Sequence, residues 1–159
     1  MADRKVEKAP AEFHAGISIV PVTLTPAAEV TINKNDHSGR LCLIPSTATA
    51  NDEYVLQTAQ RAGETYRFSA SFNAADTDTV IFKSAAADGL TFTGGILSSD
   101  EDDADAAAVI YVIPGSDDDI LTIDNPTGFD ITFTATSTTN YHVSGVASST
   151  DTHVVFGDQ

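Results

Sequence analysis

The sequence is poor in residues and runs that several protein classes require. It has one cysteine, Cys42, among its 159 residues, so no internal disulfide can form. Because Cys42 lies in the apolar run of residues 41–44, we predict a small buried side chain and not a reactive thiol. No window approaches about 18 apolar residues, and residues 1–16 lack the apolar core of a secretory signal. We therefore expect no membrane partner and synthesis in a cytoplasm.

Lys and Arg are absent from the chain after Lys83. The net charge is −15 and the pI is about 4.2. All eight Lys and Arg residues lie at or before Lys83, whereas residues 84–159 contain thirteen Asp and Glu. Such a surface repels phosphate backbones, so we expect no nucleic-acid partner.

Catalytic and metal-binding motifs are missing as well. There is no HExxH, and the histidines are scattered singly, at His14, His37, His142 and His153. There is no nucleophile elbow and no glycine-rich phosphate loop. The lack of Trp, with Tyr and Phe mostly at core positions, argues against a sugar-cleaving site. We expect neither an enzyme nor a cofactor.

Two acid-rich stretches could offer oxygen ligands to a divalent cation. They are residues 98–105 (SSDEDDAD) and 117–119 (DDD). Counted from Asp100, an EF-type loop would need glycine at position six and glutamate at position twelve, and the sequence has neither. We interpret both stretches as solvated turns and keep three weak candidates for a metal site, Asp117, Asp118 and Asp119.

The sequence does have a repeated alternation of apolar and polar residues. Residues 130–156 read DITFTATSTTNYHVSGVASSTDTHVVF, in which Ile131, Phe133 and Ala135 alternate with threonines before a polar tip at 137–140. This pattern predicts a β-hairpin. Gly145 marks a bulge or a close backbone approach in its second arm. A last short strand is predicted at 153–156.

The other segments also indicate strands. Residues 64–72 (ETYRFSASF) alternate most regularly, and residues 17–25 should form an edge or bent strand because Pro21 cannot donate to a ladder. Gly94 and Gly95 are predicted to reverse the chain, and residues 106–113 to form a buried strand. About eleven short strands at regular spacing predict an all-β fold, either an antiparallel sandwich or a jelly-roll-like barrel.

The domain organisation is predicted to be simple. Residues 17–159 are expected to form a single β domain, and residues 1–16 an extended N-terminal arm. The arm is either a disordered tail or a segment that orders against a partner. Val6, Phe13 and Ile17 give it apolar anchors, which favours the second interpretation.

Four short segments, taken in order, resemble a pattern shared by small accessory proteins of tailed-bacteriophage virions, commonly head decoration (cement) proteins. The segments are residues 40–45 (RLCLIP), 63–68 (GETYRF), 88–94 (DGLTFTG) and 140–146 (NYHVSGV). Tyr141 stands where that pattern usually has Trp.

The resemblance implies a structural virion protein that trimerises, binds the major capsid protein on the outer surface of an icosahedral head and stabilises it against internal DNA pressure. Candidate capsid contacts are Arg4, Lys5, Lys8 and Phe13. An acidic body also favours the outer surface, because the interior is filled with DNA. Two alternatives remain open: a receptor- or glycan-binding β module of a virion fibre or cell surface, and an acidic β domain of unrelated cellular function.

Overall fold

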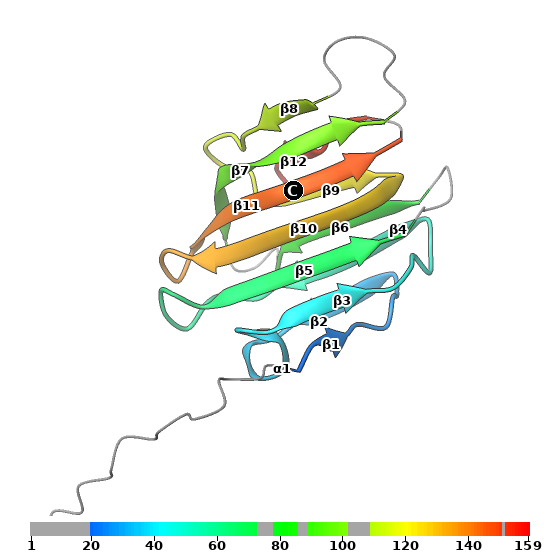
Figure 1. The fold of residues 1–159 in the computed structure, drawn as a ribbon. Coiled ribbons are helices and arrows are strands. Elements are labelled where there is room, and N and C mark those ends of the chain that lie inside the picture. The colour runs from blue at the N-terminus through cyan, green and yellow to red at the C-terminus, as the bar shows by residue number, and fades with distance from the viewer. Residues whose placement is uncertain (1–19, 73–77, 86–88, 102–108, 151) are drawn as a thin grey trace, which may run out of the picture.

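Two β-sheets face each other across a hydrophobic core in the computed structural model (Figure 1). The structure describes residues 20–72, 78–85, 89–101, 109–150 and 152–159. Almost all of its regular structure is strand, which confirms the predicted all-β sandwich. In the described part of the chain, the single helix is α1 (Lys34–His37). The predicted arm, residues 1–16, lies outside the described residues.

The two sheets differ in size. Sheet A has seven strands, in the order β1 (Val22–Thr23), β3 (Leu41–Ile44), β5 (Thr65–Ser71), β10 (Pro126–Ala135), β11 (Asn140–Ser149), β7 (Thr91–Asp100) and β8 (Val109–Val112). Sheet B has five, in the order β12 (Val155–Gly157), β9 (Ile120–Asp124), β6 (Thr79–Ser84), β4 (Asn51–Leu56) and β2 (Glu29–Ile32).

The sheets are mixed, and not antiparallel as predicted. From β1 to β6 the chain crosses to the opposite sheet after every strand, and each of β3 to β6 lies beside the strand two places earlier and runs in the same direction. This places β1, β3 and β5 parallel in sheet A, and β2, β4 and β6 parallel in sheet B. Strand alternation in the sequence is the same for either pairing direction, so the pattern could not reveal it.

The hairpin predicted at residues 130–156 is confirmed and lies at the centre of sheet A. Its arms are β10 and β11, and Ala135 pairs with Tyr141 next to the tip. Gly145 has φ of +146°, and a Cβ placed on it would lie 2.2 Å from the carbonyl oxygen of Asp130. The register continues past Gly145 without a shift, so this glycine permits a close backbone approach and not a bulge.

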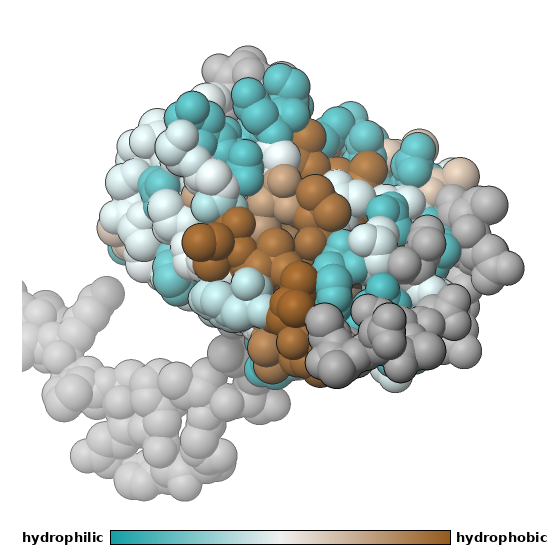
Figure 2. Space-filling view, turned by 90° about the horizontal axis from the view of Figure 1, so that it is seen from above, coloured by the Kyte–Doolittle hydropathy of each residue, from teal (hydrophilic) through white to brown (hydrophobic). Residues whose placement is uncertain are grey.

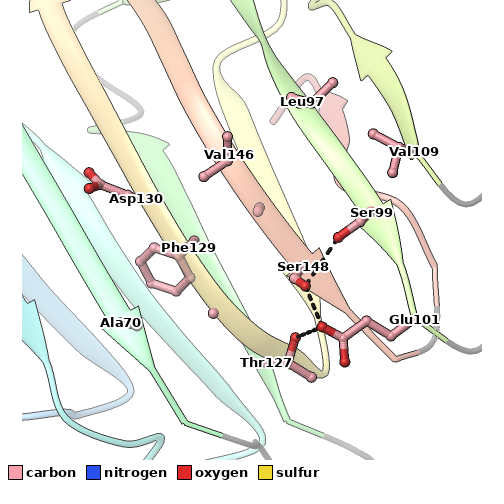
Figure 3. A pocket seen from close by; sticks show the side chains of 12 residues that line it. Ala70, Leu97, Ser99, Glu101, Val109, Thr127, Phe129, Asp130, Val146 and Ser148 are labelled. Atoms are coloured by element: carbon pink, nitrogen blue, oxygen red, sulfur yellow. Dashed lines mark hydrogen bonds between the residues drawn. The ribbon is translucent and has the colours of Figure 1, made fainter.

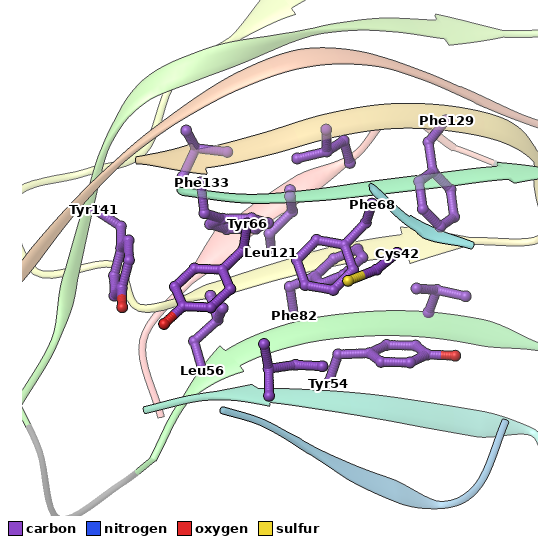
Figure 4. Close-up of a cluster of buried hydrophobic side chains, with 14 of the residues drawn as sticks. Cys42, Tyr54, Leu56, Tyr66, Phe68, Phe82, Leu121, Phe129, Phe133 and Tyr141 are labelled. Carbon is purple, nitrogen blue, oxygen red and sulfur yellow. The ribbon is translucent and has the colours of Figure 1, made fainter. Parts of the chain in front are cut away.

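The core between the sheets is built around aromatic rings (Figure 4). Phe82 of β6 lies at its centre, with its ring centroid 4.8 Å from that of Phe68 and 5.4 Å from those of Tyr54 and Phe133. These are favourable aromatic distances, and the rings join sheet B to sheet A. Cys42 is fully buried here, as predicted, and burial raises the pKa of its thiol to about 11.

The reversal predicted at Gly94 and Gly95 is wrong, because β7 runs through both residues without turning. A Cβ on Gly94 would lie 2.2 Å from the carbonyl oxygen of Val143 on β11, and φ of Gly94 is +95°. The glycine pair therefore lets neighbouring backbone and side chains come close to a strand that continues through it, which the sequence alone does not distinguish from a turn.

Candidate docking surface

Exposed apolar side chains gather at one end of the sandwich. Among the described residues, all the exposed large hydrophobic side chains except Val20 lie on β8, on its neighbours or on the nearby edge strand β12. We call this set the β8 patch: Leu97, Val109, Ile110, Tyr111, Ile113, Val146 and Val155. Figure 2 looks onto this end and shows apolar surface bordered by polar residues. Contiguous apolar surface with a polar border is typical of a protein-docking site.

The patch is exposed because sheet A extends beyond sheet B. The segment that leads into β12 covers the inner face of β7: the Val154 amide donates to the Ser98 hydroxyl of β7 at 3.0 Å. β8 lies one strand further out, and Tyr111 is 63% exposed and Val109 57%. The prediction of a buried strand at residues 106–113 is therefore wrong for its described part. An apolar run predicts that a strand is buried. It does not tell whether the strand is buried within its own chain or against a partner.

β8 is the last described strand of sheet A. Among the described strands it pairs with β7 alone, and its four residues, VIYV, include no charge and no proline. Edge strands are normally protected by such residues or kept very short. The opposite edge of sheet A follows the usual rule, since β1 has two residues and directly follows Pro21.

Gly95 fixes the position of Tyr111 on the outer face of sheet A. A Cβ on Gly95 would lie 2.7 Å from the Cζ atom of the Tyr111 ring. The missing side chain therefore makes room for the ring to lie across β7. This positions an aromatic side chain of the kind that is enriched in protein interfaces.

A groove of about 640 Å³ lies on the outer face of sheet A beside the patch (Figure 3). Leu97, Val109 and Val146 form its apolar side, and Ser99, Ser148 and Gly128 contribute small groups to its lining. Leu97 and Val146 are register partners on β7 and β11, so they form a continuous apolar ridge. We call this feature the Glu101 groove, after the carboxylate at its end.

The Glu101 carboxylate is held in place by hydroxyl groups. Ser148 and Thr127 both donate to its Oε1 atom, at 2.6 and 2.8 Å, and the Ser99 hydroxyl is 3.1 Å from that of Ser148. The hydrogen bonds from Ser148 and then Thr127 keep the pKa of Glu101 below its ordinary value. The groove therefore has a fixed negative charge at one end of an apolar wall.

A second carboxylate of the groove is already paired. Asp130 forms a bidentate contact with Arg67, whose Nε lies 2.8 Å from Oδ1. The hydrogen bond from Arg67 lowers the pKa of Asp130, although partial burial acts in the opposite direction. Glu101 thus differs from Asp130, because hydroxyl groups fix its position without neutralising its charge.

The predicted site residues do not come together in the structure. Asp118 accepts the Gly115 amide at 2.6 Å, while the buried Asp119 accepts the Ser84 hydroxyl at 2.6 Å and the Gln159 amide group at 3.0 Å. In the part of the chain that the structure describes, no group of three or more His, Cys, Asp or Glu side chains could hold a metal ion. The candidate capsid contacts lie outside the described residues: Arg4, Lys5, Lys8 and Phe13.

Sequence reasoning missed the residues of the patch and the groove, although one signal was present. Tyr141 and Val143 point into the core, and Val146 is out of phase with both, so an apolar residue at that position should have been placed on the outer face. Glu101 gave no such signal, since it is one acid among several in residues 98–105.

No protein-family model, curated protein or solved structure matches this chain. Among the described residues, no helix has the length and apolar character needed to span a membrane.

Proposed function

We propose that this protein is a structural protein without catalytic activity that docks on the surface of a larger protein assembly through the β8 patch. The observation that carries this proposal is the gathering of exposed apolar side chains on an unprotected sheet edge. Water-exposed apolar surface costs free energy, at about 25 cal/mol for each Å² that remains uncovered. A partner that covers the patch recovers this free energy.

The sandwich behind the patch suits a docking role. Five of the patch residues stand on strands of sheet A, Val155 stands on β12 of sheet B, and Ile113 follows β8. The packed aromatic core behind them means that little order has to be gained when a partner binds. Tyr111 and the aliphatic side chains of the patch supply the apolar surface of an interface.

The assembly that we propose is the outer surface of a tailed-phage head, where the protein would act as a trimeric decoration protein bound to the major capsid protein. The support for this choice is the resemblance of four segments to decoration proteins, together with the acidity of the body. A net charge of −15 opposes a location among packaged DNA and is compatible with the outside of the shell.

Binding to purified heads that lack this protein tests the proposal. The wild type should co-sediment with the heads to saturation, and heads that carry it should retain their DNA to a higher temperature. Replacing Val109 and Tyr111 together by serine should weaken binding at least about tenfold, because both side chains lie in the apolar centre.

The matched control is Val20→Ser. Val20 is a valine outside the patch and is 67% exposed. Head binding by this variant should equal that of the wild type. Wild-type protein that fails to bind heads would contradict the capsid location. Equal binding by the Val109/Tyr111 variant would remove the patch from the proposed mechanism.

A further inference from the structure

We propose that the Glu101 groove binds a basic side chain, and that this side chain comes from residues 1–19 of a second copy of the protein. This inference goes beyond the proposed function, because it concerns a contact between copies that requires no capsid. It assigns a neighbouring copy, in place of the capsid, as the partner of the arm cations.

The lining of the groove matches the side chain of Lys or Arg. Leu97 and Val146 offer an apolar wall to the aliphatic stem, and Glu101 offers a carboxylate to the charged head. Both hydroxyl donors bind Oε1, and Oε2 accepts no hydrogen bond from the described residues. A cation that meets an oriented carboxylate forms a charge-assisted hydrogen bond, which is about twice as strong as a neutral one.

Most of the described cations of the chain are already engaged. Lys34, Lys83 and Arg67 form ion pairs with carboxylates, and Arg40 donates to backbone oxygens, so of the described cations only Arg61 forms no ion pair or hydrogen bond that engages its charge. The other three cations of the chain lie in residues 1–19: Arg4, Lys5 and Lys8.

The charge balance favours this segment over the body of a second copy. Residues 1–19 contain three cations and three carboxylates, so the whole net charge of −15 falls on residues 20–159. Acidic residues precede and follow β8 in the sequence, at 100–103 and 117–119. Two bodies that met at β8 would bring these carboxylates together, whereas the neutral segment can approach without net repulsion.

Val20, the first described residue, and the Glu101 side of the groove lie toward opposite edges of sheet A. Val20, where the described chain begins, accepts hydrogen bonds from Arg40 next to β3, at the β1 end of sheet A (Figure 1). Six strand spacings of about 4.8 Å separate β1 from β8, which is about 29 Å. Nineteen extended residues span up to about 60 Å, so the segment can reach the β8 end of an adjacent copy.

A contact within one copy is less favourable. To reach Leu97, Val146 and Glu101 of its own copy, the segment would have to cross the outer face of β3, β5 and β10, where polar residues such as Thr65, Arg67 and Thr132 lie. Val6, which lies between the arm cations in the sequence, would cover little apolar surface there. In a neighbouring copy, the segment would meet the apolar wall of Leu97 and Val146 without crossing these strands. Contacts of this head-to-tail kind close into rings when the rotation permits, as a trimer requires.

The first test is the mass of the purified full-length protein in solution, measured by sedimentation velocity without heads. The wild type should form an oligomer. Replacing Arg4, Lys5 and Lys8 together by serine, or Glu101 alone by glutamine, should weaken association at least about tenfold. Asp117→Asn is the matched control and should leave association unchanged, and circular dichroism should show that every variant is folded.

The salt dependence of the oligomer distinguishes association through residues 1–19 from direct contact between two β domains. The Debye length falls from about 10 Å at 0.1 M salt to about 3 Å at 1 M, so the oligomer should dissociate as salt rises. An oligomer that grows stronger with salt would indicate apolar contact between acidic bodies and would overturn the inference. A wild type that is monomeric at all concentrations would overturn it as well.

The second test determines whether the segment and the groove that it binds belong to different copies. Lys5→Cys in one chain and Leu97→Cys in another, both in a Cys42→Ala background, should form a disulfide between chains after mixing. Lys5→Cys paired with Thr31→Cys, on the exposed side of β2, should not. The control is a single chain that carries both cysteines and is oxidised at high dilution. A disulfide within that chain would show that the segment binds its own groove, and it would overturn the inference. Because neither test uses heads, a protein that assembles in this way but ignores heads would refute only the proposed function.

Discussion

Tyr54 and Tyr141 allow the packing of the core to be tested by one chemical change at two sites. Both side chains are fully buried, with a relative exposure of 0%. The Tyr141 hydroxyl donates to the backbone oxygen of Gln57 at 2.9 Å, whereas the Tyr54 hydroxyl has no hydrogen-bond partner among the described residues. Replacing each by phenylalanine removes one oxygen atom and leaves the ring in place.

The two substitutions should change the free energy of unfolding in opposite directions. Tyr141→Phe leaves the Gln57 carbonyl without its donor and should lower the free energy of unfolding by about 1 to 2 kcal/mol. Tyr54→Phe removes a hydroxyl whose burial is not compensated and should raise it by about 1 kcal/mol. The two variants should therefore differ by about 2 to 3 kcal/mol, and for a chain of this length each kcal/mol shifts Tm by about 2 to 4 °C.

Urea unfolding followed by circular dichroism measures both values, and the slope with denaturant should be the same for both variants and the wild type. The wild type, Tyr54→Phe and Tyr141→Phe are compared in one buffer near neutral pH, where burial keeps the pKa of both hydroxyls far above the solution pH. An equal loss of stability in the two variants would refute the reasoning, since it would show that the Tyr54 hydroxyl also contributes a net favourable interaction.

Three further changes test other parts of the structure. Gly145→Ala should cost at least about 2 kcal/mol in a urea titration, because its Cβ would meet the Asp130 carbonyl, while Gly157→Ala has open space and should be nearly neutral. Phe82→Ala should cost about 3 to 5 kcal/mol by the same measurement, and a smaller loss would show that the core collapses around the cavity. Asp130→Asn should cost less than about 1 kcal/mol at pH 7, because the pair with Arg67 is solvent-exposed. Since Arg67 lowers the folded-state pKa of Asp130, this stabilisation is present above the unfolded pKa of about 3.9 and is lost as the pH falls through the folded value. A difference between wild type and Asp130→Asn that persists at pH about 2 would contradict this assignment.

The sequence predicted most strands because their signal is local. In residues 64–72 every second side chain points into the core, and the structure shows this alternation in β5. The hairpin of β10 and β11 was predictable for the same reason, since its two arms are separated by a short polar tip. The edge position of β1 followed from Pro21. Each of these features depends on residues within one or two strands.

The features that position the candidate site were not predictable, because they depend on distant segments. Gly94 and Gly95 have the composition of a turn, and only the presence of Val143 and Tyr111 shows that they permit close packing. Glu101 becomes an oriented carboxylate because Thr127 and Ser148 reach it from the hairpin, 26 and 47 residues further along the chain.

The sequence by itself determined that this is an acidic, strand-built chain with a buried cysteine, because composition and alternation are properties of neighbouring residues. Only the tertiary structure decided that successive strands alternate between two mixed sheets, and that the apolar strand β8 faces water. The physical reason is that a side chain's burial depends on what packs over it. Sheet B has too few strands to cover the last strand of sheet A, and that mismatch is a property of the whole fold.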